Sequence, residues 1–395
     1  MTSEWNHFAL GEITELVIDY RGKTPKKLGG DWCKQGYRAL SAKNIKTGRI
    51  VQAETIRYID ESLYRKWMKD EVQRGDILIT SEAPFGQIFF WDSDEKIVLS
   101  QRLFCVRIKP EYDARFIYYY MTTPEFQSEL DGRATGTTVI GLRQPELMKC
   151  IIRCPEIQEQ KVIAAILSSI DAKIIANEKV NDNLQQQAFS VFDNLIANAE
   201  NNDYTVSDYA FLNPKRTLAK NQVARSIDMS QLSTSGAFPS GWEMKPFNGG
   251  MRFTNGDTLL ARITPCLENG KTAFIDFLDD GEVAFGSTEY IVLAPKNDTP
   301  PEMLYCLARY PAFVDYAVKN MNGSSGRQRV SAETVGQYRL PLFDKHSLVL
   351  FKEVVSPMFL KMRYNSLENM RLAELRDALL PKLMSGEIDV SAVQL

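Results

Sequence analysis

The sequence predicts a mixed α/β fold with two globular α/β units, separated by two long helices that form an antiparallel coiled coil. The second half is predicted to be a pseudo-two-fold repeat of the first. The chain has 395 residues, enough for two or three domains at about 100–200 residues each. The same order of short motifs occurs in both halves, and a long helical pattern follows each. Contents of 44% hydrophobic and 25% charged residues are ordinary globular values and exclude disordered and collagen-like chains.

Both globular units contain the same series of short motifs. A Gly-Asp pair leads into a strand-like stretch at residues 74–80 and again at 255–262. A proline, a glycine, an apolar stretch and a β-rich stretch follow in each half, and then an aromatic-rich helical stretch and a polar loop. Because internal repetition predicts duplicated structure, we expect globular units at residues 1–155 and 200–345. The helical stretches are 114–130 and 301–319, and the polar loops are 132–138 and 322–329.

Each unit is followed by a long helical pattern, at residues 156–199 and within 346–395. No proline or glycine occurs between Glu156 and Ala199, so this helix would be roughly 60 Å long. In the second pattern, Pro357 predicts a break with Ser356 as the new N-cap, and Pro381 and Gly386 predict the end. Narrow apolar stripes predict a two-helix seam, although two ordinary core helices would show a similar pattern. The expected seam residues are Ile163, Leu167, Ile170, Ile174, Leu184, Val355, Met358, Met362 and Leu372.

Asparagines interrupt both stripes, at Asn177, Asn181 and Asn365. An asparagine buried at a helix seam commonly fixes the register of the two helices. We therefore expect these residues to set how the helices align.

Membrane, secreted and metal-binding classes are disfavoured. No apolar run approaches the ~20 residues needed to cross a bilayer, and the first residues contain no apolar signal-peptide segment. Cys150 and Cys154 lack further ligands at zinc spacing, and His7 and His346 are far apart in the chain. We expect a cytoplasmic protein with reduced thiols and no metal site.

Candidate catalytic motifs are incomplete. Residues 269–272 (Asn-Gly-Lys-Thr) resemble the end of a phosphate-binding loop, but Pro265 stands where that loop needs glycine. Asp228, Glu243 and Lys245 match the two carboxylates and lysine of metal-dependent nucleases, so a nuclease or nicking enzyme is one alternative. A structural coiled-coil adaptor is another. We expect a non-catalytic protein with no cofactor of its own.

Basic residues gather early in the first unit. Ten Lys/Arg from Arg21 to Arg57 oppose only Asp31 and Glu54, a local net charge of +8. Such clustering suits phosphate contacts and base recognition in DNA, whereas a solvated basic face is the simpler alternative. In the second half, residues 327–329 (Arg-Gln-Arg) are suited to guanine and adenine edges. The candidate DNA-binding residues are Arg21, Lys23, Lys26, Lys27, Arg38, Lys43, Asn44, Thr137, Thr138, Lys215, Arg216, Arg225, Arg327, Gln328 and Arg329.

Three stretches resemble those of a known family. Residues 155–160 (Pro-Glu-Ile-Gln-Glu-Gln) lead into the first helical pattern, and residues 375–388 end the second with Leu-Arg-Asp-Ala-Leu-Leu-Pro-Lys-Leu-Met-Ser-Gly-Glu-Ile. Residues 265–272 match a third element. With the order of units and helices, nearly the whole chain resembles the specificity subunit of a type I restriction–modification system. One departure is that residues 343–346 lack the Glu-Gln pair found at 159–160.

The resemblance implies a DNA-recognition subunit without catalytic activity. Residues 1–155 and 200–345 would be target-recognition domains, each reading one half of a bipartite double-stranded target. The helices would set the spacing of the halves and dock two modification subunits, which methylate adenine with S-adenosylmethionine. An ATP-driven restriction subunit would join the assembly.

Overall fold

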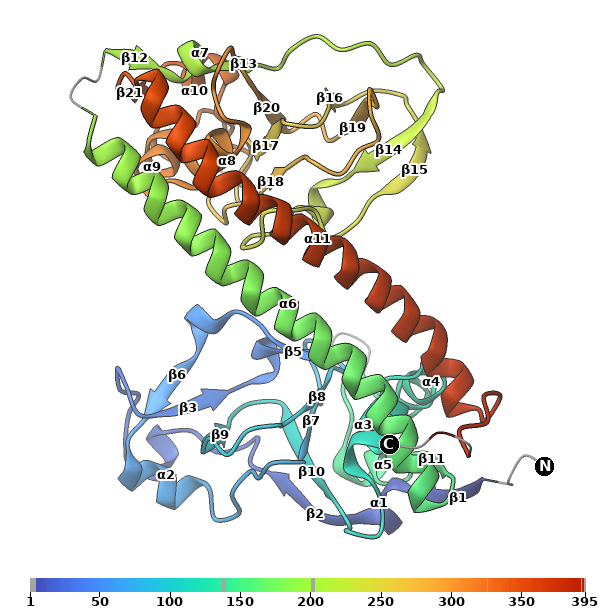
Figure 1. Cartoon of the computed structure of the whole chain (residues 1–395). Coiled ribbons are helices and arrows are strands. Elements are labelled where there is room, and N and C mark those ends of the chain that lie inside the picture. The colour runs from blue at the N-terminus through green and yellow to red at the C-terminus, as the bar shows by residue number, and fades with distance from the viewer. Residues whose placement is uncertain (1–4, 137–139, 200–202, 325, 392, 394–395) are drawn as a thin grey trace. The chain divides into compact units, whose positions relative to one another are not determined.

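The computed structural model describes residues 5–136, 140–199, 203–324, 326–391 and 393 (Figure 1). The chain divides into two compact units. Unit 1 comprises Met1–Ile170 and Leu375–Leu395, and unit 2 comprises Asp171–Glu374. The long helices α6 (Ile157–Ala197) and α11 (Lys345–Met384) each contribute a part to both units. No helix among the described residues is long and apolar enough to span a bilayer.

The described residues of unit 1 form mainly short strands, together with five short helices. Its strands are β1 (Asn6–Ala9), β2 (Thr14–Asp19), β3 (Tyr37–Leu40), β4 (Ile45–Lys46), β5 (Arg49–Ile50), β6 (Arg57–Ile59), β7 (Ile77–Thr80), β8 (Ile88–Phe90), β9 (Ile97–Leu99), β10 (Leu103–Ile108) and β11 (Ile151–Cys154). Its helices are α1 (Leu10–Ile13), α2 (Glu61–Trp67), α3 (Ala114–Met121), α4 (Pro124–Arg133) and α5 (Gln144–Leu147), with 3-10 turns η1 (Lys26–Leu28), η2 (Ala42–Asn44) and η3 (Ala53–Thr55).

Unit 2 repeats most of these elements. Its strands are β12 (Tyr204–Thr205), β13 (Ala210–Leu212), β14 (Val223–Ile227), β15 (Glu243–Pro246), β16 (Met251–Phe253), β17 (Thr258–Ala261), β18 (Thr272–Phe274), β19 (Ala284–Gly286), β20 (Tyr290–Pro295) and β21 (Arg339–Leu340). Its helices are α7 (Val206–Tyr209), α8 (Pro301–Arg309), α9 (Pro311–Lys319) and α10 (Ala332–Gly336), with the 3-10 turn η4 (Met229–Gln231).

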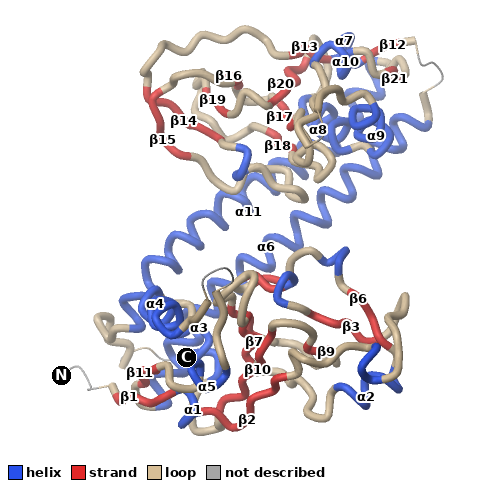
Figure 2. Tube along the Cα trace, turned by 180° about the vertical axis from the view of Figure 1, so that it is seen from behind, coloured by secondary structure: helices blue, strands red, loops and turns tan. Residues whose placement is uncertain are grey.

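The sheet topology confirms the predicted repeat. Unit 1 contains a four-stranded sheet in the order β2-β10-β7-β8, and unit 2 contains one in the order β13-β20-β17-β18. In a second sheet, β3 pairs in parallel with β9 and antiparallel with β6, as β14 does with β19 and β15. The short sheets β1-β11 and β12-β21 also correspond. Figure 2 shows these strands in red within each unit.

Strand registers relate individual residues of the two units. Leu40 of β3 pairs with Leu99 of β9, and Ile227 of β14 pairs with Gly286 of β19. The antiparallel neighbours β6 and β15 extend the same register. Counting from these pairs gives five equivalent positions: Ser41 and Asp228, Lys43 and Ser230, Arg57 and Glu243, Glu95 and Glu282, and Arg102 and Glu289.

The predicted break at Pro357 is wrong, because α11 continues through it as a 40-residue helix. A proline inside a helix costs about 3 kcal/mol. However, Val355, Phe359 and Met362 of the same helix are each at most 1% exposed in the unit 2 core. Each buried apolar side chain contributes roughly 1.5–3 kcal/mol, so packing outweighs the missing backbone bond. Ser356 accordingly lies inside the helix and is no N-cap.

The helices of the two aromatic-rich stretches also differ from expectation. Each aromatic-rich stretch forms two helices instead of one, because a proline (Pro124 or Pro311) occupies the first position of the second helix. Helix α11 ends at Met384, between Pro381 and Gly386, where the sequence predicted its end, and the φ of +75° at Gly386 suits glycine.

In unit 1, the two long helices contribute apolar side chains to the same core. There, Ile163 and Leu167 of α6 are buried in one core with Leu383 and Met384 of α11. The expected seam residue Ile170, in the same unit, is also buried. In unit 2, Ile174, Val355 and Met362 are buried, while Leu184, Met358 and Leu372 are partly buried.

A polar layer joins the two helices in unit 2. Asn365 donates a hydrogen bond from Nδ2 to Oδ1 of Asn181 at 2.8 Å. Asn177 donates from Nδ2 to Glu368 Oε2 at 2.7 Å and to Asn369 Oδ1 at 2.8 Å. As residue numbers rise along α6, those of their partners fall along α11, so the pair is antiparallel. All three predicted seam asparagines lie in this layer.

Candidate nucleic-acid interface

Three loops of unit 1 are tied together at one edge of its sheets. These are the β7–β8, β9–β10 and α4–α5 loops. The backbone N–H of Ser81 donates to the carbonyl of Arg102 at 2.9 Å, and that of Leu142 donates to the carbonyl of Ser81 at 3.0 Å. Thr135 and Gly141 close the base of the third loop with a pair of backbone hydrogen bonds. We call this surface the loop face.

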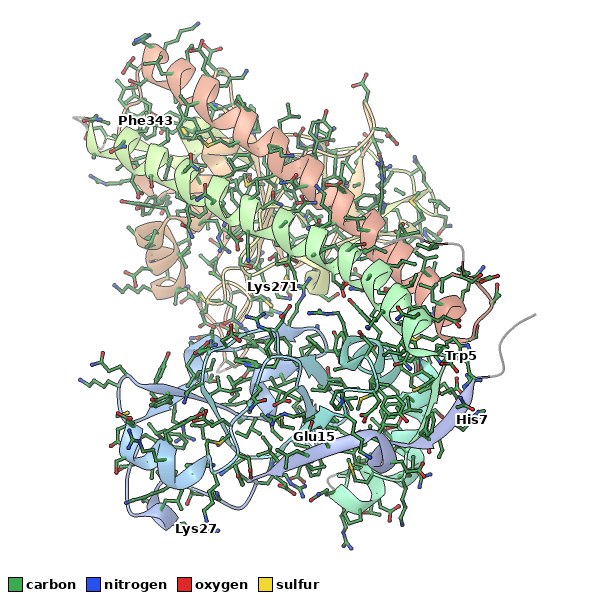
Figure 3. The ribbon with its side chains drawn as sticks, turned by 60° about the horizontal axis from the view of Figure 1, so that its bottom comes forward. Trp5, His7, Glu15, Lys27, Lys271 and Phe343 are labelled. Carbon is green, nitrogen blue, oxygen red and sulfur yellow. The ribbon has the colours of Figure 1, made fainter. Side chains whose placement is uncertain are left out.

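Unit 2 builds the same loop face from equivalent loops. The backbone N–H of Arg262 donates to the carbonyl of Glu289 at 3.0 Å, and that of Val330 donates to the carbonyl of Arg262 at 3.0 Å. Asn322 and Arg329 close the base of the α9–α10 loop. Lys271, labelled in Figure 3, donates from Nζ to the carbonyl of Met229 at 2.7 Å and so ties the β17–β18 loop to η4.

A pocket of about 190 Å³ opens on the loop face of unit 1. Lys43, Arg57, Gln101 and Arg102 supply its long polar side chains, and Trp32 is its one aromatic residue. The guanidinium of Arg57 lies 4.3 Å from the centroid of the Trp32 ring. Within the described part of the chain, no carboxylate pairs with Lys43 or Arg57. This pocket therefore brings Lys43 and Arg57 together on the loop face of unit 1.

Sequence reasoning missed Gln101 and Arg102 as pocket residues. Neither belongs to a basic cluster in the sequence, and only the β9–β10 turn brings them beside Lys43. The one signal that could have found them was the duplication itself, since Arg102 and Glu289 occupy equivalent positions directly before a β-rich stretch.

Two of the predicted arginines form equivalent ion pairs in the two units. Arg38 donates to Glu95 through Nε at 2.6 Å and through Nη2. Its counterpart Arg225 pairs with Glu282, which is equivalent to Glu95, and with Asp279 at 3.2 Å. Because the same pair occurs in both repeats, we assign these arginines to the scaffold, with much of their charge neutralised.

Three further arginines are also paired with carboxylates. Arg21 contacts Asp19 at 2.8 Å, and Arg216 contacts the buried Asp257 at 2.7 Å. Arg329 forms a two-pronged contact with Glu289, with distances of 2.7–3.0 Å, and holds the pKa of that carboxyl below its usual range. Five of the predicted DNA-binding arginines are therefore committed to contacts within the protein.

The other candidates differ in how accessible they are. Asn44 is 1% exposed. Its Oδ1 accepts a hydrogen bond from the backbone N–H of Ser41, and its Nδ2 donates to Thr55 Oγ1 at 3.0 Å, so Asn44 supports the pocket from inside. Lys23 lies over the Tyr20 ring and bonds the carbonyl of Trp67. Gln328 is half-buried. The exposed candidates are Lys26, Lys27, Lys43, Lys215 and Arg327, of which Lys27 is labelled in Figure 3. Thr137 and Thr138 lie outside the described residues.

The residues of the nuclease alternative do come together in unit 2. Lys245 Nζ lies 2.9 Å from Asp228 Oδ2 and 3.0 Å from Glu243 Oε2. These two hydrogen bonds raise the pKa of Lys245. The ammonium group thus bridges the carboxylates, and in the described residues no group of three or more Asp, Glu, His and Cys side chains could hold a metal ion. All six cysteines are free thiols.

Comparison with known proteins gives consistent matches. Residues 2–186 match the family model described as "Type I restriction modification DNA specificity domain". The chain is 28% identical to the type I restriction enzyme MjaVIII specificity subunit of Methanocaldococcus jannaschii over 189 residues, which are 46% of this chain and only 43% of that protein. It is 22% identical to the HindI specificity subunit of Haemophilus influenzae over 406 residues, covering 81% of this chain and 88% of that one.

A solved structure shares the fold of the whole chain. The S subunit of a type I restriction–modification system from M. genitalium superimposes with a TM-score of 0.57, at 17% identity, over 96% of both chains.

Proposed function

We propose that this chain belongs to the family of type I restriction–modification specificity subunits and is the DNA sequence-recognition subunit of such a complex. Unit 1 and unit 2 each read one half of a bipartite double-stranded target through their loop faces. This chain would select the DNA sequence, and partner subunits would catalyse the reactions.

The observation that carries this proposal is that one loop face occurs twice with different side chains. The backbone hydrogen bonds of the loops are the same in both units, whereas residues such as Arg57 and Glu243 differ at equivalent positions. A duplicated frame with unequal side chains suits two different half-sites, because base readout depends on side-chain donors and acceptors.

The two long helices would set the spacing between the half-sites. Helix α6 has 41 residues and runs from unit 1 into unit 2 without interruption, and α11 returns. At 1.5 Å per residue, α6 is roughly 60 Å long. Since neither helix is broken, insertion of residues would change the spacing in regular steps of rise and rotation.

The same helices would dock the modification subunits. In unit 2, a groove of about 640 Å³ lies between the end of α6 and the start of α11, where Phe343 is labelled in Figure 3. Val349, Leu350 and Val354 of α11 are each 45–47% exposed. Exposed apolar side chains on one surface indicate a protein-binding site. We infer two modification subunits that methylate adenine with S-adenosylmethionine, an ATP-dependent restriction subunit, and action in the cytoplasm.

Methylation mapping tests the function directly. Cells carrying this gene with its modification and restriction genes are compared with cells that lack only this gene, by single-molecule sequencing. We expect a bipartite adenine-methylated motif that disappears with the gene. Identical methylation patterns in the two strains would contradict the proposal.

A further inference from the structure

The pocket on the loop face of unit 1 differs in charge from the equivalent place in unit 2. Register equivalence pairs Arg57 with Glu243 and Arg102 with Glu289, and it pairs Ser41 with Asp228. At two of these three positions, unit 1 therefore presents an arginine where unit 2 presents a carboxylate, and at the third a neutral serine of unit 1 corresponds to an aspartate. The reversal concerns side chains only, because η2 and η4 share the same capping arrangement.

Two of the cations in the unit 1 pocket are available to a ligand. Arg102 is partly neutralised by Glu82, at 3.0 Å. Lys43 is exposed and Arg57 is exposed, and neither pairs with a carboxylate in the described residues. Both carry only donors, so their ligand must present acceptors.

The position of Arg57 favours a base edge over a phosphate. Its guanidinium lies 4.3 Å from the centroid of the Trp32 ring, which orients the planar fork of donors. Arg57 and Lys43 line the same pocket, and a concave site can accept the edge of a base. Guanine is the only base whose major-groove edge shows two adjacent acceptors, O6 and N7, and the planar guanidinium of Arg can donate to both at once, in a fixed geometry that the ammonium of Lys lacks.

We propose that Lys43 and Arg57 read a guanine in the half-site bound by unit 1, and that unit 2 does not accept guanine at the corresponding position. This inference rests on the proposed function. In unit 2, Asp228 and Glu243 would face the electron-rich guanine acceptors with anionic oxygens that cannot donate a hydrogen bond, and the single ammonium of Lys245 is already shared between these carboxylates. The two half-sites therefore differ at this position for an electrostatic reason.

The test uses the full chain with its modification subunits. Methylation mapping of the wild type first gives the motif and its guanine positions. Arg57→Lys keeps the charge but loses the two-pronged fork, and we expect one guanine of one half-site to become degenerate while the other half-site is unchanged. Lys66→Ala, which removes an exposed lysine outside the pocket, is the matched control and should leave the motif intact.

Binding to defined duplexes separates base recognition from phosphate contact. Replacing that guanine by 7-deazaguanine removes the N7 acceptor but keeps O6, so it should weaken wild-type binding by part of the roughly 5- to 150-fold that a complete two-pronged base contact contributes. The same replacement should have little effect on Arg57→Ala. If the variant instead loses affinity equally for all sequences, Arg57 contacts phosphate and the proposal is overturned.

Two further outcomes are distinguishable. If wild-type cells show no bipartite motif, the proposed function fails and this inference fails with it. If the motif exists but is the same in Arg57→Lys and in Lys43→Ala, only the guanine assignment fails. Because Arg57 packs on Trp32, a thermal melt checks folding, and exposed Lys43 provides the variant that leaves packing intact.

Discussion

Unit 1 and unit 2 share a backbone design but differ in the charges placed on it. Both contain a strand arginine paired with a glutamate from the loop before the parallel neighbouring strand, Arg38 with Glu95 and Arg225 with Glu282. Both also bury an aspartate at the Gly-Asp motif. The loop faces themselves carry opposite charges at equivalent positions. Repeated contacts thus mark the scaffold, and positions that differ mark recognition, a distinction that one copy alone could not provide.

The largest effect is expected from the buried aspartates, which test the scaffold half of the comparison. Asp76 is 1% exposed and receives two hydrogen bonds from Arg107, each 2.9 Å long. Asp76→Ala should destabilise unit 1 by about 3–5 kcal/mol, because Arg107 loses its partner in a buried place. Asp257→Ala should act similarly on unit 2 through Arg216.

Urea unfolding of each variant measures this effect. Asp94→Ala removes a carboxylate that is 82% exposed and pairs with Arg74, so it serves as the control and should leave unfolding unchanged. If Asp76→Ala unfolds at the wild-type urea concentration, the Gly-Asp motif is not a scaffold element.

A smaller loss is expected at the helix pair, where the two units also differ. Its unit 1 part is apolar, whereas its unit 2 part contains the asparagine layer. Asn181→Leu leaves the buried Nδ2 of Asn365 without its acceptor and should cost about 1–3 kcal/mol. The double variant with Asn365→Leu removes both partners and should recover most of that stability.

Thermal unfolding of both variants, with methylation mapping of the double variant, completes this test. Because a buried asparagine fixes register, the double variant is expected to accept more than one spacer length. A single unchanged spacer length would show that apolar packing alone sets the register.

A moderate change in affinity is expected from the exposed lysines of unit 1. Lys26→Ala with Lys27→Ala should weaken binding to any DNA sequence and make the salt dependence less steep by about 0.9 for each phosphate that the variant no longer neutralises. Titrations at several salt concentrations measure this slope, with Lys66→Ala as the control. An unchanged slope would remove these lysines from the interface and leave the pocket as the main DNA-binding surface of unit 1.

The smallest effect is expected at the repeated surface ion pair. Arg38 and Glu95 are 30% and 43% exposed, so Arg38→Ala should cost at most about 1 kcal/mol of stability. The DNA affinity of both Arg38→Ala and Arg225→Ala should stay close to that of the wild type. Fluorescence anisotropy with the mapped target measures this. A tenfold loss in either variant would place that arginine on DNA and contradict its assignment to the scaffold.

Sequence patterns predicted the architecture well because duplication and helical periodicity are local or repeated signals. The order of motifs around Asp76 and Asp257 predicted two equivalent sheets, and an uninterrupted helical pattern predicted α6. The pattern failed at Pro357, where a local rule about proline was overridden by the buried side chains of α11. Helix-breaking tendency is a property of a few residues, whereas core packing depends on segments far apart in the chain.

The sequence by itself determined the class of the fold, the duplication and the antiparallel helices with their asparagines, since periodicity, spacing and repeated motifs are written along the chain. Only the tertiary structure decided which basic residues are free. Arg38 and Lys43 look alike as members of one basic run, yet a carboxylate 57 residues away neutralises Arg38, and in the described residues none reaches Lys43. Ion pairing depends on distances of a few ångströms between segments, and those distances exist only once the strands have paired.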